Sequence, residues 1–104
     1  MNKYRNHKVL FNGEVFDSKH EFRRWRELLF MQKANIITDL QRQVPFVIIP
    51  KSEHGRAIKY IADFVYTEVG TGKQVVEDAK GVKTDVYRIK KRLMAEQGIE
   101  IVEV

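Results

Sequence analysis

Apolar and polar residues recur with different periods along this chain of 104 residues, and the first third predicts a hairpin and a helix. Two short β-prone runs flank Asn12-Gly13, a dipeptide that suits a type I′ turn, so residues 8–16 are expected to pair as a hairpin. Ser18 and Glu21 stand at the spacing of a capping box, which predicts a helix that continues to about residue 34. Its expected apolar face contains Phe22, Trp25, Leu28 and Leu29.

Three strand-like segments follow, over residues 40–49, 58–67 and 74–80. The first contains Pro45, which cannot donate a ladder hydrogen bond and therefore favours an edge strand or a bulge. The second is apolar on both faces, as expected of an interior strand. Strict alternation predicts that its two faces hold Lys59, Ile61, Asp63 and Val65 on one side, and Tyr60, Ala62, Phe64 and Tyr66 on the other.

A second helix is predicted over residues 84–97, and Gly98 suits the position just after a helix C-terminus. A last strand is expected over residues 99–104. The apolar stripe of this helix is expected to contain Val86, Ile89, Leu93 and Met94. The chain shows no repeat and no linker, so we expect one α/β domain over residues 1–104, in the order hairpin, α, β, β, β, α, β.

Charge and composition narrow the class of partner. The chain has 19 basic and 14 acidic residues, a formal net charge of +5, and no cysteine. A basic balance favours a polyanion such as nucleic acid, although many basic proteins bind none. No apolar run approaches the roughly 20 residues that span a bilayer, and the N-terminal residues lack a signal peptide's apolar segment. We therefore expect a cytoplasmic protein without a membrane partner.

Charged residues inside the predicted strands are the strongest sign of chemistry. Asp63 interrupts an apolar strand, and Asp78 and Lys80 stand two residues apart, so their side chains share a face of the next strand. Carboxylates bind Mg²⁺ beside a scissile phosphate, while a lysine orients or helps deprotonate the attacking water. The alternatives are a solvated face and a cross-strand ion pair, since an isolated D-x-K is a weak motif. Glu77 points to the opposite face, where a structural or solvated role is expected.

Glu21 has two competing interpretations. Its capping-box position explains it structurally, yet it shares a helix face with Trp25 and Leu28, which turn toward the sheet. A carboxylate placed there reaches the same metal ion. Both roles use the same oxygen atoms, and the residues alone leave the choice open.

Basic and polar residues on the helices are candidates for contacts with DNA phosphates, although solvated helix faces explain most such charges. Thr84, Tyr87 and Lys91 lie at i, i+3 and i+7 and form one row just after Lys80. The complete candidate set is Lys19, Arg23, Lys83, Thr84, Tyr87, Lys90 and Lys91.

Three motifs occur in a recognisable order: Phe16-Asp17-Ser18-Lys19-His20-Glu21, Tyr60-Ile61-Ala62-Asp63-Phe64, and Val76-Glu77-Asp78-Ala79-Lys80-Gly81. With the order α-β-β-β-α-β, they resemble the PD-(D/E)XK nuclease core. More closely, the chain resembles small phage-encoded endonucleases regarded as Holliday-junction-resolvase-like. Ala62 stands where the PD label has proline, a position that is loose in the superfamily.

The resemblance implies a restriction-endonuclease-like fold with a mixed central sheet flanked by helices, and hydrolysis of phosphodiester bonds. It implies that Asp63, Asp78, Glu21 and the backbone of Ala79 hold Mg²⁺ or Mn²⁺, and that Lys80 serves the attacking water. The expected substrate is branched DNA in phage recombination or replication, cut by a homodimer in the bacterial cytoplasm without a small-molecule cofactor. A nuclease without junction preference and an inactive DNA-binding module of the same fold remain the alternatives.

Overall fold

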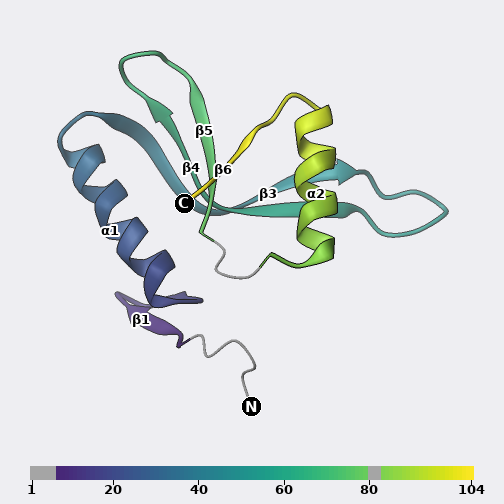
Figure 1. Cartoon of the computed structure of the whole chain (residues 1–104), viewed down its shortest axis with the longest axis horizontal. Helices are drawn as coiled ribbons and strands as arrows, with labels where there is room; N and C mark the ends of the chain where they lie inside the picture. Colours follow the sequence, from purple (N-terminus) through teal and green to yellow (C-terminus); the bar gives the residue numbers. More distant parts are fainter. Residues whose placement is uncertain (1–6, 80–82) are drawn as a thin grey trace.

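A computed structural model of the chain describes residues 7–79 and 83–104. Its elements follow the predicted order (Figure 1). They are β1 (Val9–Phe11), β2 (Glu14–Phe16), α1 (Lys19–Lys33), β3 (Ile37–Ile49), β4 (Ile58–Glu68), β5 (Gln74–Asp78), α2 (Asp85–Glu96) and β6 (Ile101–Glu103). Within the described ranges, no helix is both long and apolar enough to cross a membrane.

The N-terminal hairpin forms as the Asn-Gly dipeptide predicts. Strands β1 and β2 pair antiparallel, with Val9 opposite Phe16. The turn residues Asn12 and Gly13 have φ angles of 50° and 79°, and a type I′ turn requires positive φ at both of these positions. The hairpin lies beside the N-terminal end of α1 (Figure 1).

The four remaining strands form a mixed sheet in the order β3-β4-β5-β6. Strands β3, β4 and β5 are antiparallel neighbours, whereas β5 and β6 are parallel and are connected through α2. The predictions from Pro45 and from the apolar β4 segment are both confirmed, because β3 is an edge strand and β4 is interior. Strand β3 begins earlier than predicted, at Ile37, and β5 ends earlier, at Asp78.

Helices α1 and α2 pack against opposite faces of this sheet. Successive residues of β5 face opposite sides of the sheet. Val76 packs in the cluster that contains Met94 of α2, while Glu77 binds Arg24 of α1. The α2 cluster consists of Ile48, Tyr60, Ala62, Val65, Val76, Tyr87, Met94 and Ile101. The α1 cluster consists of Leu28, Ile37, Phe64, Tyr66 and Ala79.

The expectation of strict alternation along β4 is wrong at Asp63. Tyr60 and Ala62 pack on the α2 side, but Phe64 and Tyr66 pack on the α1 side. The backbone ladder stays in register across this point, with Ala62 opposite Val44 and Phe64 opposite Arg42. The even-numbered residues of β4 therefore change face at Asp63, and Val65 packs on the α2 side.

The predicted apolar stripe of α2 is also partly wrong. Met94 is wholly buried, but Val86 and Ile89 are 61% and 60% exposed. Tyr87, which was not part of the predicted stripe, is 4% exposed and belongs to the α2 cluster. An aromatic ring buries more apolar area than a valine, so the helix is oriented by Tyr87 rather than by Val86.

Candidate functional site

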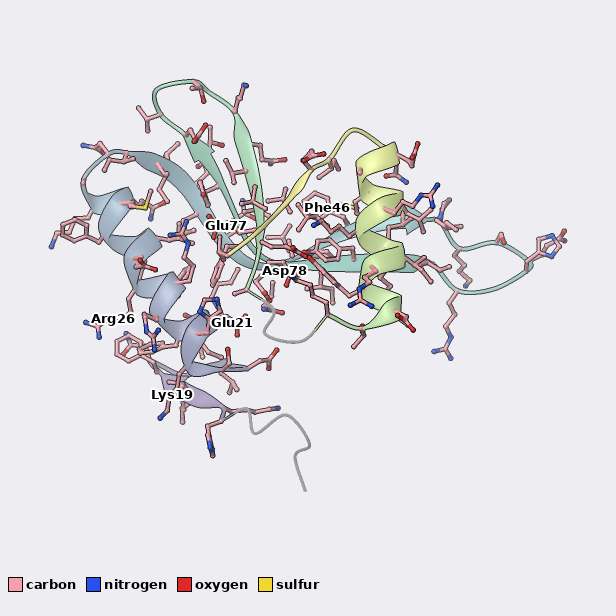
Figure 2. The ribbon with its side chains drawn as sticks, in the orientation of Figure 1. Lys19, Glu21, Arg26, Phe46, Glu77 and Asp78 are labelled. Carbon is pink, nitrogen blue, oxygen red and sulfur yellow. The ribbon has the colours of Figure 1, made fainter. Side chains whose placement is uncertain are left out.

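The start of α1 positions Glu21 and fixes its carboxyl group. Ser18 is the N-cap, and its Oγ accepts a hydrogen bond from the Glu21 N–H at 3.1 Å. The Glu21 carboxyl then reaches back, and its Oε2 accepts from the Asp17 N–H at 2.7 Å. This is a variant of the predicted capping box, because the returning bond goes one residue before the cap. Glu21 is only 2% exposed (Figure 2).

Gln43 links Glu21 to Asp63. Its Nε2 donates to Glu21 Oε1 at 3.1 Å and to Asp63 Oδ1 at 3.3 Å. The two oxygens of Glu21 are therefore divided, one serving the helix cap and the other facing the Asp63 carboxylate through one amide group. The structure thus joins the two interpretations of Glu21 that the sequence left open, since capping engages one oxygen and leaves the other toward the candidate site.

This environment changes the acidity of Glu21. Burial, with a further contribution from the nearby Asp63 carboxylate and against the lowering effect of the Asp17 N–H, raises the pKa of its carboxyl group from the ordinary 4.5 to about 7. Desolvation and a like charge both disfavour the ionised form. A buried carboxyl group with a raised pKa beside a second carboxylate marks a functional-site candidate.

Asp63 lies at an unusual place in the sheet. The described ladder pairs Arg42 with Phe64 and Val44 with Ala62, so Asp63 lies opposite Gln43. Gln43 has a φ of 53°, which is uncommon for a residue with a side chain and costs on the order of 1 kcal/mol or more. The second oxygen of Asp63, Oδ2, accepts from the Ala79 N–H at 2.8 Å. Asp63 therefore ties the centre of β4 to the segment that follows β5.

Asp78 is wholly buried at the end of β5 (Figure 2). Its Oδ2 accepts from the Tyr60 hydroxyl at 2.6 Å, on the side of the sheet that carries α2. Burial, followed by this hydrogen bond, raises the pKa of the Tyr60 phenol. The Asp63 carboxylate contributes to the same rise, so both aspartates act on one tyrosine. Asp78, the third predicted acid, therefore lies close to the candidate site, and its hydrogen bond to Tyr60 is made on the side of the sheet that carries α2.

The predicted catalytic residues are Glu21, Asp63, Asp78 and Lys80, and the first three lie within the described residues. Within residues 7–79 and 83–104, no group of three or more His, Asp and Glu side chains is arranged to hold a metal ion. Lys80 lies outside the described residues. Ala79, proposed to contribute its backbone, directs its N–H to Asp63, and its side chain is buried in the α1 cluster. The acids that the structure brings together most directly are Glu21 and Asp63.

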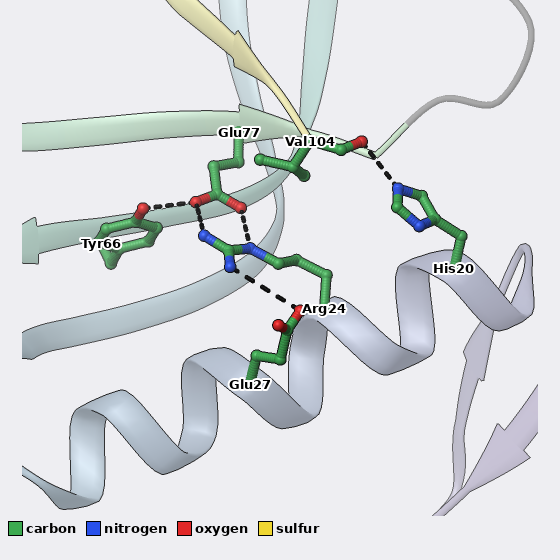
Figure 3. Close-up of polar contacts among 6 residues, drawn as sticks. All are labelled: His20, Arg24, Glu27, Tyr66, Glu77 and Val104. Carbon is green, nitrogen blue, oxygen red and sulfur yellow. Dashed lines mark hydrogen bonds and ion pairs between the residues drawn. The ribbon is translucent and has the colours of Figure 1, made fainter.

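Glu77, on the opposite face from Asp78, has the structural role predicted for it (Figure 3). It is 1% exposed and receives two hydrogen bonds from Arg24, from Nε at 2.9 Å and from Nη2 at 2.7 Å. The Tyr66 hydroxyl donates to the same carboxylate. Nothing in the helical spacing indicated that Arg24 reaches β5.

The predicted DNA-contacting residues separate into two regions. Thr84 is the N-cap of α2 and accepts from the Tyr87 N–H, and the Tyr87 hydroxyl donates to Glu103. Lys83 and Lys91 also form ion pairs with Glu103, at 3.2 Å and 3.3 Å. The Tyr87 hydrogen bond, followed by these two ion pairs, lowers the pKa of the Glu103 carboxyl group. Lys19 and Arg23 lie exposed on α1, apart from this group.

A pocket of about 250 Å³ lies between β4 and the N-terminal end of α2. Lys59 and Lys90 supply its positive charge, and Tyr60 connects it to the buried Asp78. Its lining consists of Lys59, Tyr60, Ile61, Thr84, Val86, Tyr87 and Lys90. Val86, which is exposed and does not pack in the core, is thus part of a concave surface. The helical periodicity alone did not indicate this surface.

The fold and the acidic pair define an α/β protein with a mixed sheet and a candidate acidic centre between α1 and β4. Residues 1–103 match the sequence model of a family described as a protein of unknown function, DUF1064, and the chain belongs to this family. No curated protein and no solved structure matches the chain.

Proposed function

We propose that this protein is a metal-dependent DNA endonuclease that hydrolyses phosphodiester bonds in branched DNA. The observation that carries the proposal is the Glu21–Gln43–Asp63 arrangement, in which two carboxyl groups face one amide and the acidity of Glu21 is strongly perturbed. The order of elements and the resemblance to the PD-(D/E)XK core support the same assignment.

The donor set fits a hard divalent cation. Mg²⁺ and Mn²⁺ prefer carboxylate oxygens and keep several waters, so two protein carboxylates are a sufficient anchor. Glu21 and Asp63 would hold the ion, with Asp78 and the backbone of Ala79 as the further donors that the resemblance implies. A bound ion supplies charge stabilisation at the phosphate and lowers the pKa of a water molecule.

The chain's own groups account for positioning and charge. The Asp17 N–H and the Gln43 amide orient the Glu21 carboxyl, and the Tyr60 hydroxyl fixes the Asp78 carboxylate. The pocket that contains Lys59 and Lys90 adjoins Tyr60, and its positive charge supports the proposal that a DNA phosphate binds there. Lys80 is expected to orient or deprotonate the attacking water.

A four-way junction is cut symmetrically by two active sites, so a homodimer is expected if the substrate is a junction. The decisive experiment compares cleavage of a labelled four-way junction with cleavage of its matched linear duplex, in Mg²⁺, Mn²⁺ or EDTA. Asp63→Asn and Asp78→Asn are expected to abolish metal-dependent cleavage while DNA binding persists. Asp39→Asn is the matched control, because Asp39 is exposed and its positive φ is equally suited to asparagine.

The outcomes separate the alternatives. Metal-dependent cleavage of both substrates alike would replace the junction assignment with a nuclease that lacks junction preference. Binding of DNA without cleavage, in any metal, would favour an inactive DNA-binding module. Full activity of Asp78→Asn would contradict the proposed site.

A further inference from the structure

The position of Gln43 indicates more than a structural role. Its Nε2 occupies the space between Glu21 Oε1 and Asp63 Oδ1, which are the two atoms best placed to share a cation. We propose that Gln43 is a member of the cation site, and that its side-chain amide turns over when the ion binds. In the ion-free protein the NH₂ group faces the carboxylates, and in the ion-bound protein Oε1 faces the ion. This inference rests on the cation site of the proposed function.

Electrostatics requires the amide to move. The hydrogens of an amide NH₂ carry positive partial charge, so a cation cannot share the Glu21–Asp63 space with them. The amide carbonyl oxygen is a donor that Mg²⁺ and Mn²⁺ accept. Because the NH₂ and carbonyl ends of the amide have nearly the same shape, a half-turn exchanges a group that repels the ion for one that binds it.

Gln43 is also the partner of Glu21 that has room to move. The other partner is the Asp17 backbone N–H, which is fixed at the start of α1. Gln43 is exposed, whereas Glu21 is almost fully buried. An ion that reaches Glu21 Oε1 from solvent therefore displaces the glutamine amide rather than the helix cap.

The backbone supports a dedicated role for this side chain. Gln43 has a φ of 53° inside a long strand, although the neighbouring pairs Arg42–Phe64 and Val44–Ala62 keep the regular register. A left-handed conformation at a residue other than glycine is uncommon. In β3 it occurs at Asp39, within the register shift between Thr38 and Gln41, and again at Gln43. At Gln43 this local distortion coincides with the position of the amide that contacts both acids.

The test measures cation binding directly, without DNA. Mg²⁺ and Mn²⁺ are titrated calorimetrically into the full chain and into Gln43→Met, which keeps the length of the side chain but offers no oxygen. We expect Gln43→Met to weaken binding about tenfold or more, as is typical when a metal-site residue is lost. Gln43→Glu, which supplies an oxygen again, is expected to restore binding. Gln41→Met is the matched control, since Gln41 is an exposed residue of the same strand.

A second measurement uses the unmodified protein and does not depend on the folding of a variant. The side-chain amide resonances of Gln43 are followed during Mg²⁺ titration, with those of Gln41 as an internal reference. A saturable shift confined to Gln43 is expected. Unchanged Gln43 resonances at saturating Mg²⁺, or equal affinity of Gln43→Met and the unmodified chain, would overturn the inference, as would a lack of any cation binding.

The same data distinguish this inference from the proposed function. Cation binding that depends on Gln43, in a protein that cuts no DNA, would refute the nuclease and leave the role of Gln43 intact. DNA cleavage that is accompanied by equal cation affinity in Gln43→Met and the unmodified chain would support the nuclease and refute the role proposed for Gln43.

Discussion

Replacing Glu21 with glutamine should change how the stability of the protein depends on pH. The pKa of the Glu21 carboxyl rises from 4.5 to about 7 in the folded chain, chiefly through burial. Between these values the folded state retains a proton that the unfolded chain releases, so the free energy of unfolding falls as pH rises. A tenfold change in proton affinity is worth about 1.4 kcal/mol, so the loss amounts to about 3 kcal/mol and is complete above about pH 7.

Glu21→Gln removes this titration but keeps an oxygen for the Asp17 N–H. The variant should therefore be more stable than the unmodified protein at pH 8, by up to about 3 kcal/mol, and of similar stability near pH 4.5. Urea unfolding at several pH values measures the difference between the two proteins. Glu96→Gln, on the exposed end of α2, is the control.

Divalent cation provides an independent check on the same carboxylates. At pH 8, Mg²⁺ at ten times its dissociation constant should stabilise the unmodified protein by about 1.4 kcal/mol, and Glu21→Gln by less. A difference between the two proteins that does not vary from pH 4.5 to pH 8 would refute the argument that the buried carboxyl is destabilising when ionised.

Three further changes test the packing around the site. Arg24→Met leaves the Glu77 carboxylate buried without its cation and should lower the free energy of unfolding by about 3–5 kcal/mol. The double variant Arg24→Met/Glu77→Met should recover most of this loss. A loss below about 1 kcal/mol for the single variant, measured by urea unfolding, would contradict the argument. Tyr60→Phe removes the hydroxyl that donates to Asp78 and should cost about 2 kcal/mol by the same measurement; an unchanged midpoint would mean that the bond adds nothing. Ser18→Ala should cost about 1 kcal/mol and Ser18→Gly only a few tenths, and equal losses would show that the cap is not the cause.

Local signals in the sequence were sufficient for most of the fold. Asn12-Gly13 specified the hairpin through its turn geometry, and Ser18 specified the start of α1 through its cap. Pro45 indicated the edge strand, and Gly98, with a φ of 86°, ended α2 as expected. Each of these residues acts through its own backbone or its nearest neighbours, and that is why a single sequence can reveal it.

The parts that could not be predicted depend on contacts distant in sequence. Gln43 was overlooked because a polar residue in an edge strand is ordinary, and only its position opposite Asp63 makes it notable. The partnership of Arg24 with Glu77 spans 53 positions. Periodicity also placed Val86 rather than Tyr87 on the buried face of α2, because it weighs the two residues by polarity and does not include the area that a ring buries.

The change of face at Asp63 has a consequence for how this chain tolerates length variation. In an ordinary strand, deleting one residue inverts every side chain on one side of the deletion. In β4, Tyr60 and Ala62 pack in the α2 cluster, whereas Phe64 and Tyr66 pack in the α1 cluster and Val65 packs in the α2 cluster. A deletion before Asp63 would turn Tyr60 and Ala62 out of the α2 cluster while Phe64 stayed in place. Insertions and deletions are therefore expected in the connecting loops of related chains, and the centre of β4 is expected to keep a constant length.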